Sequence, residues 1–298
     1  MISFQNIEKS FNEQLVLKKI NLEIKDGELM VLLGASGSGK TTMLRMINAL
    51  VKPDSGSILI ANKNFEKHNL FDLRKKIGYV IQKVGLFPHY SVFDNVAIIL
   101  RLKNEKEELL KQKVHNWLDK IGMPASVYAN KFPAELSGGE AQRIGLARAL
   151  VAQPKMILLD EPFSALDPIS RVEIRNEFRK IQQEESLTAV MVTHDVLEAV
   201  SMADRICLLA NGEIQQVGTP QEILFNPKNE LVNNFVKGDQ FQASLASVTL
   251  SEIQSFVQVV TLPDYDENSS VLDFLQNSNS QFHSIVLEAF YKWKEEKS

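Results

Sequence analysis

The sequence predicts an α/β protein built on a largely parallel sheet, and three observations lead to this fold class. Apolar segments typical of strands alternate along the chain with segments of helical spacing. A glycine-rich loop, Gly34–Thr41, lies between one such strand and a helix. Two carboxylates, Asp160 and Glu161, follow a second apolar strand. Because strands that alternate with helices usually form parallel sheets covered by helices, we expect that arrangement here.

The expected strands are short apolar or alternating segments bounded by turn residues. Asn211-Gly212 is a strong hairpin signal between the last two of them. In order, the predicted strands are Ile2–Ile7, Leu15–Ile24, Leu29–Leu33, Ser57–Ala61, Met156–Leu159, Ala189–Thr193, Ile206–Leu209 and Glu213–Gly218.

The expected helices are recognised by apolar residues spaced three and four apart. A mostly helical block over residues 92–121 interrupts the alternation of strands and helices, which indicates an insertion. The predicted helices outside this block are Thr42–Leu50, one that begins after Leu136, Ser170–Glu184 and Asp195–Ser201.

Composition excludes several classes of protein. Of 298 residues, 44% are apolar and 23% charged, as in an ordinary globular protein, which excludes a collagen-like or wholly disordered chain. A net charge of −4 gives no sign of a nucleic-acid partner. The acidity lies in the tail, since residues 239–298 hold nine acids and three lysines. One cysteine and no apolar run of membrane length predict a soluble protein in a reducing compartment, reaching a membrane only through a partner.

The glycine-rich loop fits the phosphate-binding pattern G-x-x-x-x-G-K-[ST]. Glycines let backbone N–H groups turn toward phosphate oxygens, and the following helix presents its positive end to them. The lysine is expected to reach the β- and γ-phosphates of ATP, and the Thr41 hydroxyl to bind Mg²⁺. The alternative is an ordinary glycine turn before a helix. The candidate nucleotide-binding residues here are Gly34, Ala35, Ser36, Gly37, Ser38, Gly39, Lys40, Thr41 and Thr42.

The carboxylate pair at Asp160 and Glu161 is expected at the carboxyl end of a parallel strand, where ligands bind in α/β sheets. Asp160 suits indirect binding of Mg²⁺, in which its carboxylate orients the groups that contact the ion. Glu161 suits a general base that activates water for attack on the γ-phosphate. Acids after a strand are also common as helix caps, which is the alternative interpretation.

A second candidate anion-binding loop opens the helix after Leu136. Ser137, Gly138 and Gly139 place backbone N–H groups at a helix start, and Glu140 completes the pattern. The same residues fit a capping box, in which Ser137 caps the helix and Glu140 reaches back to it. The two roles are compatible.

These motifs, in their order along the chain, resemble those of the nucleotide-binding subunit of an ABC transporter. The phosphate loop matches Walker A, the Leu136–Glu140 loop matches the family signature, and Asp160–Glu161 matches the end of Walker B. The resemblance implies an ABC ATPase of the phosphate-loop class, with a RecA-like core sheet, an N-terminal antiparallel β subdomain and an inserted helical subdomain. The implied domains are a nucleotide-binding domain over 1–237, with the helical subdomain at about 83–136, and an acidic extension over 238–298.

The resemblance also implies roles for residues that carry little signal alone. Gln82 matches the Q-loop, which links Mg²⁺ and nucleotide state to a membrane partner, and Ser164–Asp167 matches the D-loop. His194 matches the histidine that contacts the γ-phosphate and orients the attacking water. Phe11 matches the aromatic residue that stacks on adenine. The alternative is a polar strand end for Gln82, a structural histidine for His194 and a core phenylalanine for Phe11.

The implied partners follow from the same family. Two copies would form a head-to-tail dimer that holds each ATP between Walker A of one copy and the signature of the other. Transmembrane permease subunits, and through them a substrate-binding protein, would complete the complex. The chain would then lie peripherally on the cytoplasmic face of the membrane, and no nucleic acid is implied.

One stretch carries information on the subfamily. Ile77–Val96 resembles the matching segment of osmoprotectant importers for glycine betaine, choline or proline, and Met46–Asn48 and Asp160–Ser170 point the same way. Amino-acid, polyamine and sugar importers also carry Leu-Phe-Pro-His, so they remain alternatives. A soluble non-transport ABC ATPase, an inactive ATP-sensing subunit and an exporter are less favoured rivals.

Two further expectations concern surfaces. Leu86, Phe87 and Tyr90 are placed to dock a coupling helix of the permease, unless they pack inside the helical block. The tail is too short for the paired regulatory module of many osmoprotectant ATPases. It offers a strand-like run, Phe256–Leu262, and an amphipathic C-terminal helix whose apolar face holds Phe282, Ile285, Val286, Phe290 and Trp293.

Overall fold

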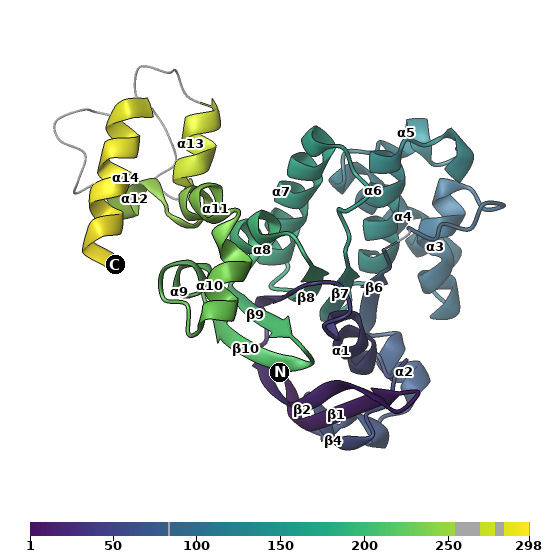
Figure 1. Ribbon diagram of the computed structural model, residues 1–298. Coiled ribbons are helices and arrows are strands. Elements are labelled where there is room, and N and C mark those ends of the chain that lie inside the picture. Colours follow the sequence, from purple (N-terminus) through teal and green to yellow (C-terminus); the bar gives the residue numbers. More distant parts are fainter. Residues whose placement is uncertain (83, 254–268, 278–282, 298) are drawn as a thin grey trace.

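The computed structural model describes residues 1–82, 84–253, 269–277 and 283–297, and it contains two sheets (Figure 1). The first is a four-stranded antiparallel sheet near the N-terminus, in the order β2-β1-β4-β5. Its strands are β1 (Ile2–Phe11), β2 (Gln14–Ile24), β4 (Ser55–Ile60) and β5 (Lys63–Asn64).

The second sheet has six strands in the order β10-β9-β3-β8-β7-β6. All neighbours pair in parallel except β9 and β10, which form the predicted antiparallel hairpin. These strands are β3 (Leu29–Leu33), β6 (Ile77–Val80), β7 (Met156–Asp160), β8 (Thr188–Thr193), β9 (Arg205–Ala210) and β10 (Glu213–Gly218).

The core lies on both faces of this parallel sheet. Along β3, Leu29, Val31 and Leu33 join a cluster formed with the helices, whereas Met30 and Leu32 join a cluster formed with the antiparallel sheet. Successive side chains of a strand point to opposite faces. A strand covered on both faces therefore reads as a continuous apolar run, as β3, β7 and β8 do.

The helices surround this sheet, and those inserted between β6 and β7 form a separate helical lobe (Figure 1). The lobe holds α3 (Val92–Leu102), α4 (Glu107–Lys120), α5 (Ala125–Tyr128) and α6 (Gly138–Leu150). The other helices up to residue 237 are α1 (Lys40–Ile47), α2 (Leu70–Arg74), α7 (Pro168–Glu184), α8 (Val196–Met202), α9 (Pro220–Phe225) and α10 (Glu230–Lys237).

The C-terminal residues form further helices with an apolar cluster of their own. Val286, Phe290 and Trp293 are buried in it, and the Trp293 ring meets that of Phe225 edge-on, with centroids 5.4 Å apart. The predicted run Phe256–Leu262 and Phe282 lie outside the described residues. The helices are α11 (Gln240–Ser247), α12 (Leu250–Ile253), α13 (Val271–Asn277) and α14 (His283–Lys297).

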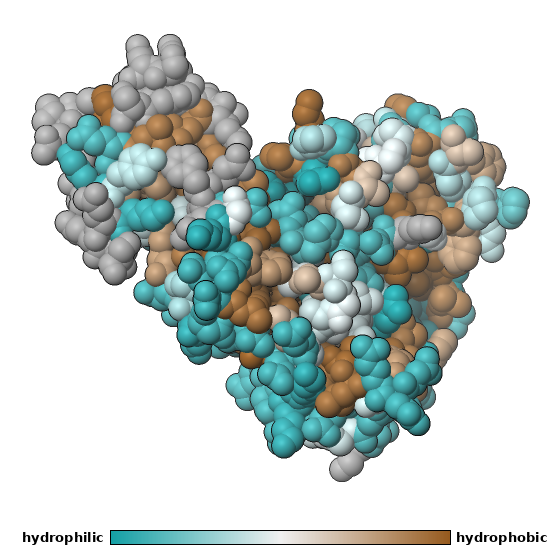
Figure 2. Space-filling view, viewed as in Figure 1, coloured by the Kyte–Doolittle hydropathy of each residue, from teal (hydrophilic) through white to brown (hydrophobic). Residues whose placement is uncertain are grey.

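The molecular surface is mixed in character. On the face shown in Figure 2, hydrophobic residues gather over the helical lobe around α3, whereas hydrophilic residues dominate the outer side of the antiparallel sheet. Among the described residues, no helix combines the length and apolar character needed to cross a membrane.

Candidate active site at the carboxyl edge of the parallel sheet

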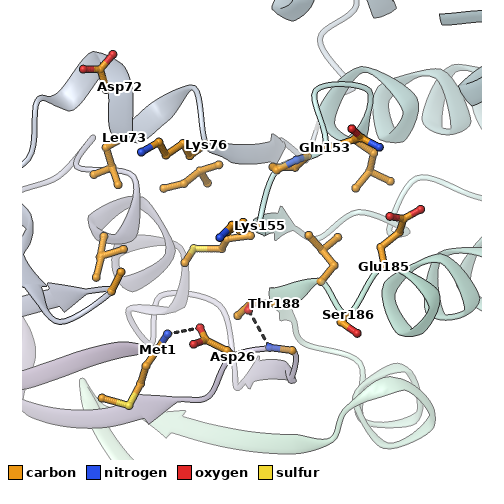
Figure 3. Close-up of a pocket in the computed structure, with 18 of the residues that line it drawn as sticks. Met1, Asp26, Asp72, Leu73, Lys76, Gln153, Lys155, Glu185, Ser186 and Thr188 are labelled. Carbon is orange, nitrogen blue, oxygen red and sulfur yellow. Dashed lines mark hydrogen bonds and ion pairs between the residues drawn. The ribbon is translucent and has the colours of Figure 1, made fainter. Parts of the chain in front are cut away.

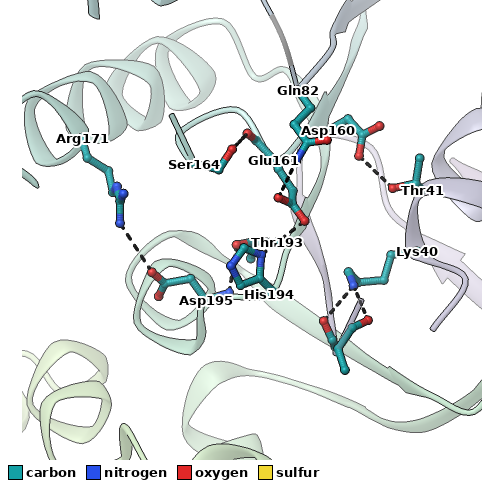
Figure 4. Close-up of polar contacts among 12 residues, drawn as sticks. Lys40, Thr41, Gln82, Asp160, Glu161, Ser164, Arg171, Thr193, His194 and Asp195 are labelled. Carbon is teal, nitrogen blue, oxygen red and sulfur yellow. Dashed lines mark hydrogen bonds and ion pairs between the residues drawn. The ribbon is translucent and has the colours of Figure 1, made fainter. Parts of the chain in front are cut away.

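Four parallel strands end at the same edge of the sheet, and a predicted site residue lies at or just after the end of each. The Gly34–Thr41 loop follows β3, Gln82 lies two residues after β6, Asp160 ends β7, and His194 follows β8. The structure thus gathers side chains that are up to about 150 residues apart in sequence (Figure 4). This edge is where open α/β sheets bind their ligands.

Two glycines of the phosphate loop combine a left-handed backbone angle with close neighbours, so another residue at either position would strain the backbone and collide with its surroundings. Gly34 has φ of 153°, and a Cβ there would lie 2.2 Å from the Leu209 carbonyl oxygen. Gly39 has φ of 103°, and its Cβ would lie 2.5 Å from the Leu17 side chain. Only glycine combines these left-handed angles with such close approach, so the loop takes a shape that other residues would prevent.

The loop directs polar groups toward a place for phosphate. Lys40 is 5% exposed, and its Nζ donates to the carbonyl oxygens of Gly34 and Ala35, at 2.7 and 2.8 Å. Burial lowers the pKa of this ammonium, while Glu161 and Asp160 oppose the shift. The Ser38 hydroxyl is buried with no hydrogen-bond partner among the described residues. A buried cation and an unsatisfied hydroxyl donor fit an anionic, oxygen-rich ligand.

A second group of oxygens lies beside the loop and fits Mg²⁺. Thr41 Oγ1 donates to Asp160 Oδ1 at 2.9 Å, and Arg45 Nη2 lies 3.9 Å from Asp160 Oδ2. Burial raises the pKa of Asp160, and Arg45 opposes that shift. The described residues contain no group of three or more His, Cys, Asp or Glu side chains placed to hold a metal. Mg²⁺ needs none, because it is commonly held by one or two protein oxygens together with substrate phosphates and water.

Glu161 is held in a defined position by residues from neighbouring strands. Its φ is 45°, a left-handed angle that is costly for a non-glycine residue, and its N–H donates to the Val192 carbonyl at 3.0 Å. Gln82 Nε2 donates to Glu161 Oε2 at 3.0 Å. His194 Nδ1 lies 3.2 Å from Glu161 Oε1. Both carboxylate oxygens are therefore engaged by the two residues that the resemblance singles out.

The predicted signature residues lie at the start of α6, on the helical lobe. The Ser137 N–H donates to Glu140 Oε2 at 2.7 Å and the Glu140 N–H to Ser137 Oγ at 3.2 Å, which confirms the predicted capping box. These hydrogen bonds lower the pKa of Glu140. A Cβ at Gly138 would meet nothing within 4 Å, so this helix start is open. Among the described residues, no hydrogen bond joins this loop to the phosphate loop.

Phe11 ends β1, beside the hairpin that leads to β2. Its side chain is 45% exposed, so the alternative of a core phenylalanine does not hold. Lys9 Nζ lies 5.2 Å from the centroid of its ring. Stacking of the ring on adenine stays a prediction.

Two residues near Asp160 were not predicted. Arg45 and Tyr79 both contact its carboxylate, and burial raises the pKa of the Tyr79 phenol. Arg45 lies four residues after Thr41, so both side chains project from the same face of α1. This spacing is a signal that could have identified Arg45, whereas Tyr79 carries no comparable signal in the sequence.

A parallel sheet with a phosphate loop at its carboxyl edge is characteristic of the phosphate-loop nucleoside triphosphatases, and this chain has that fold. A family model described as "ABC transporter" matches residues 17–164. The chain is 38% identical over 266 residues to the osmoprotectant import ATP-binding protein of Salmonella typhimurium, covering 88% of this chain and 70% of that protein. The chain therefore belongs to the ATP-binding proteins of ABC transporters, which bind ATP with Mg²⁺, and the expected fold class is confirmed.

Two further relatives differ in the transport that their names describe. The chain is 45% identical over 237 residues to the glycine betaine/carnitine/choline transport ATP-binding protein of Bacillus subtilis, covering 79% of this chain and 62% of that protein. It is 43% identical over 306 aligned positions to the spermidine/putrescine import ATP-binding protein of Mycoplasma mycoides subsp. mycoides SC, covering 98% of this chain and 85% of that one.

Solved structures agree with the fold. A dimeric ATP-binding cassette in a post-hydrolysis state, bound to ADP and Pi, matches with a TM-score of 0.67 and 34% identity, covering 74% of this chain and 98% of the other. A part of the cbiONQ ABC transporter complex of Clostridium perfringens matches with a TM-score of 0.70 and 28% identity, covering 83% and 98%.

Proposed function

We propose that this chain binds and hydrolyses ATP and thereby drives an ABC importer. The observation that carries the proposal is the position of Glu161. Its carboxylate lies between Gln82 and His194, at the sheet edge that also holds the phosphate loop. A carboxylate fixed on both oxygens is suited to accept a proton from a water molecule placed beside it.

The site residues divide the work of hydrolysis between binding and proton transfer. The N–H groups of the phosphate loop and Lys40 hold the phosphates of ATP, and the exposed Phe11 ring stacks on adenine. Glu161 accepts the proton of the attacking water, and His194 orients that water and the γ-phosphate. Thr41, Asp160 and Gln82 would hold Mg²⁺, which when bound neutralises charge on the phosphate oxygens.

A head-to-tail dimer accounts for the second anion-binding loop. Ser137, Gly138 and Gly139 form an open helix start on the helical lobe, apart from the phosphate loop of the same chain. In a dimer, this loop of one copy closes over the ATP held by the other. The dimeric state of a solved relative supports this arrangement.

The segment after Gln82 forms the surface for the permease. Asn95 is fully buried, and its side chain accepts from the Phe87 N–H and donates to the carbonyls of Phe87, Tyr90 and Ser91. Held in this way, Phe87 and Tyr90 stay 45% and 43% exposed, with ring centroids 5.4 Å apart. Leu86, by contrast, packs against the core. The two rings form an apolar contact for a coupling helix on the cytoplasmic face of the membrane.

For the transported solute, a quaternary ammonium osmoprotectant is the first candidate. The 45% identical Bacillus relative, named for glycine betaine, carnitine and choline, supports it. A polyamine is the second candidate, because the spermidine/putrescine relative matches 98% of this chain. That match includes most of the acidic extension over 238–298.

The test of this function uses the full chain reconstituted with its permease and binding protein in vesicles. We expect ATP-dependent uptake of radiolabelled glycine betaine that spermidine does not inhibit. Uptake of spermidine instead would select the second candidate. ATP hydrolysis without uptake of any small solute would overturn the importer function.

A further inference from the structure

We infer that Arg171 is a positioning residue that links the loop Ser164–Asp167 to the loop of His194, and so keeps His194 against Glu161. The inference rests on the proposed ATPase function and assigns a residue to that same site. Arg171 lies one turn into α7, immediately after the Ser164–Asp167 loop.

The guanidinium of Arg171 contacts both loops, and Figure 4 shows its contact with Asp195. Its Nη2 donates to the Leu166 carbonyl oxygen at 3.0 Å. Its Nη1 lies 3.9 Å from Asp195 Oδ2, the carboxylate of the residue after His194. The side chain thus links the turn that follows the catalytic glutamate with the turn that carries the histidine.

The Asp195 end of this link is anchored in the fold. The Asp195 N–H donates to Thr193 Oγ1 at 3.1 Å, and its Oδ1 accepts from the Glu198 N–H at 2.9 Å, capping α8. One carboxylate oxygen therefore holds the helix start while the other faces Arg171. Because His194 lies between Thr193 and Asp195 in the chain, fixing these two residues limits where its ring can lie.

The Leu166 end returns to the catalytic glutamate. Ser164 Oγ donates to the Glu161 carbonyl oxygen at 3.0 Å. The start of the loop is therefore bound to the backbone of the proposed general base. Together with the chain itself, these contacts connect Glu161, through Ser164 and Leu166, to Arg171 and Asp195, and the His194 Nδ1 next along the chain lies 3.2 Å from Glu161 Oε1. The Arg171 side chain completes this connection.

Arginine suits this position better than lysine. Its planar guanidinium presents donors in several fixed directions, so it can bind a carbonyl and a carboxylate that lie on different sides. The Arg171 Nε is buried with no hydrogen-bond partner among the described residues, so the group holds a further unused donor. A lysine ammonium is a compact charge on a flexible stem, so it would bind either the Leu166 carbonyl or the Asp195 carboxylate but not both.

The contact with Asp195 is too exposed to contribute much to stability. The Arg171 and Asp195 side chains are 33% and 39% exposed, and partly exposed ion pairs contribute little to the free energy of unfolding. The expected consequence of losing it is kinetic instead, because a misplacement of about 1 Å in a catalytic group can cost about a hundredfold in rate.

The experiment measures kcat and KM for ATP with Arg171→Gln and Arg171→Lys in the full chain. We expect kcat to fall about tenfold or more in both variants, with KM for ATP within about twofold, since the phosphate loop is untouched. Lys180→Gln is the matched control. It removes a charge from the same helix at a side chain that is 77% exposed and pairs with Glu184 at 3.9 Å, so we expect no change.

A second variant keeps the inference testable if Arg171→Gln does not fold. Asp195→Asn preserves the helix cap, because Asn caps as well as Asp, yet removes the charge that faces Arg171. We expect it to lower kcat, and to add little to the loss in the double variant. Fully multiplicative losses, or an unchanged kcat in Asp195→Asn and Arg171→Lys, would overturn the inference. Absence of ATPase activity in the unsubstituted chain would instead overturn the proposed function itself.

Discussion

The two ends of the parallel sheet differ, because the carboxyl end holds the charged site residues whereas the amino end opens into a cavity. At the carboxyl end, Lys40, Asp160 and Glu161 gather buried or partly buried charges, and the two carboxylates act electrostatically on the Lys40 ammonium. At the amino end, a cavity of about 850 Å³ opens between the two sheets and the ends of α6 and α7 (Figure 3). The presence of a cavity at the amino end is therefore not evidence of the reacting centre.

The charges of the amino-end cavity are paired or lie in solvent. The N-terminal amine of Met1 pairs with Asp26, and Thr188 Oγ1 accepts from the Gly27 N–H at 2.9 Å. Glu185 pairs with Lys120 at 2.6 Å. The helices that follow β3, β7 and β8 (α1, α7 and α8) begin on the carboxyl side of the sheet, so this side presents helix N-termini, with their N–H groups and positive ends, to an anion. The comparison indicates that the direction of the helices relative to the sheet determines which edge can bind an anionic ligand.

The largest expected effect tests the carboxyl end directly. Replacing Glu161 with Gln removes the proton acceptor while keeping the size of the side chain. We expect kcat to fall by about 10²- to 10⁴-fold, the range for loss of a general base. The variant should also accumulate as an ATP-bound dimer, detected by light scattering. Normal turnover would contradict the role of Glu161 and leave the carboxyl end without a base.

Lys40 tests binding at the same end. Lys40→Ala removes a charge-assisted donor from the phosphate loop, so we expect the Kd for ATP to rise about tenfold or more. Titration with a fluorescent ATP analogue measures it, and the melting temperature without nucleotide checks the fold. An unchanged Kd would show that the backbone of the loop suffices for phosphate binding.

A buried carboxyl near the carboxyl end predicts a pH dependence of stability. Burial raises the pKa of Glu198 from 4.5 to about 7, while Thr193, Arg175 and Arg171 oppose the shift and Asp195 adds to it. The folded chain therefore binds a proton more tightly than the unfolded chain. The resulting stability is fully present below pH 4.5 and is lost as the pH rises through about 7.

The Glu198→Gln variant isolates this effect. From pH 4.5 to above pH 7, we expect the wild-type chain to lose up to about 3 kcal/mol of unfolding free energy relative to the variant. Urea unfolding of both proteins at pH 5 and pH 8 measures the difference. Equal pH slopes for the two proteins would show that Glu198 stays ionised in the folded chain.

The smallest effect is expected at the amino end. Lys155 lines the cavity there, directly before β7, and its side chain is exposed. We expect Lys155→Ala to change kcat and KM for ATP by less than about twofold, because surface substitutions away from a site are nearly neutral. A tenfold loss of activity would contradict the difference between the two ends and show that the cavity takes part in hydrolysis.

Much of the fold could be predicted because its signals are local. The buried strands β3, β7 and β8 are continuous apolar runs, and the phosphate loop is one contiguous pattern. The helices α2 and α9 were not predicted, since so few residues carry no resolvable period. In the tail, the predicted C-terminal helix is present as α14, whereas α11 and α13 were not predicted.

The sequence by itself determined the chemistry available to this protein, because each motif places its residue types within a few positions of one another. Only the tertiary structure decided which of those residues meet. Glu161 and His194 lie 33 residues apart yet 3.2 Å from each other, and Arg171 contacts both of their loops. The physical reason is the parallel sheet, which brings the ends of distant strands to one edge. No local pattern records that edge, so Arg171 and the burial of Glu198 could be recognised only in the folded chain.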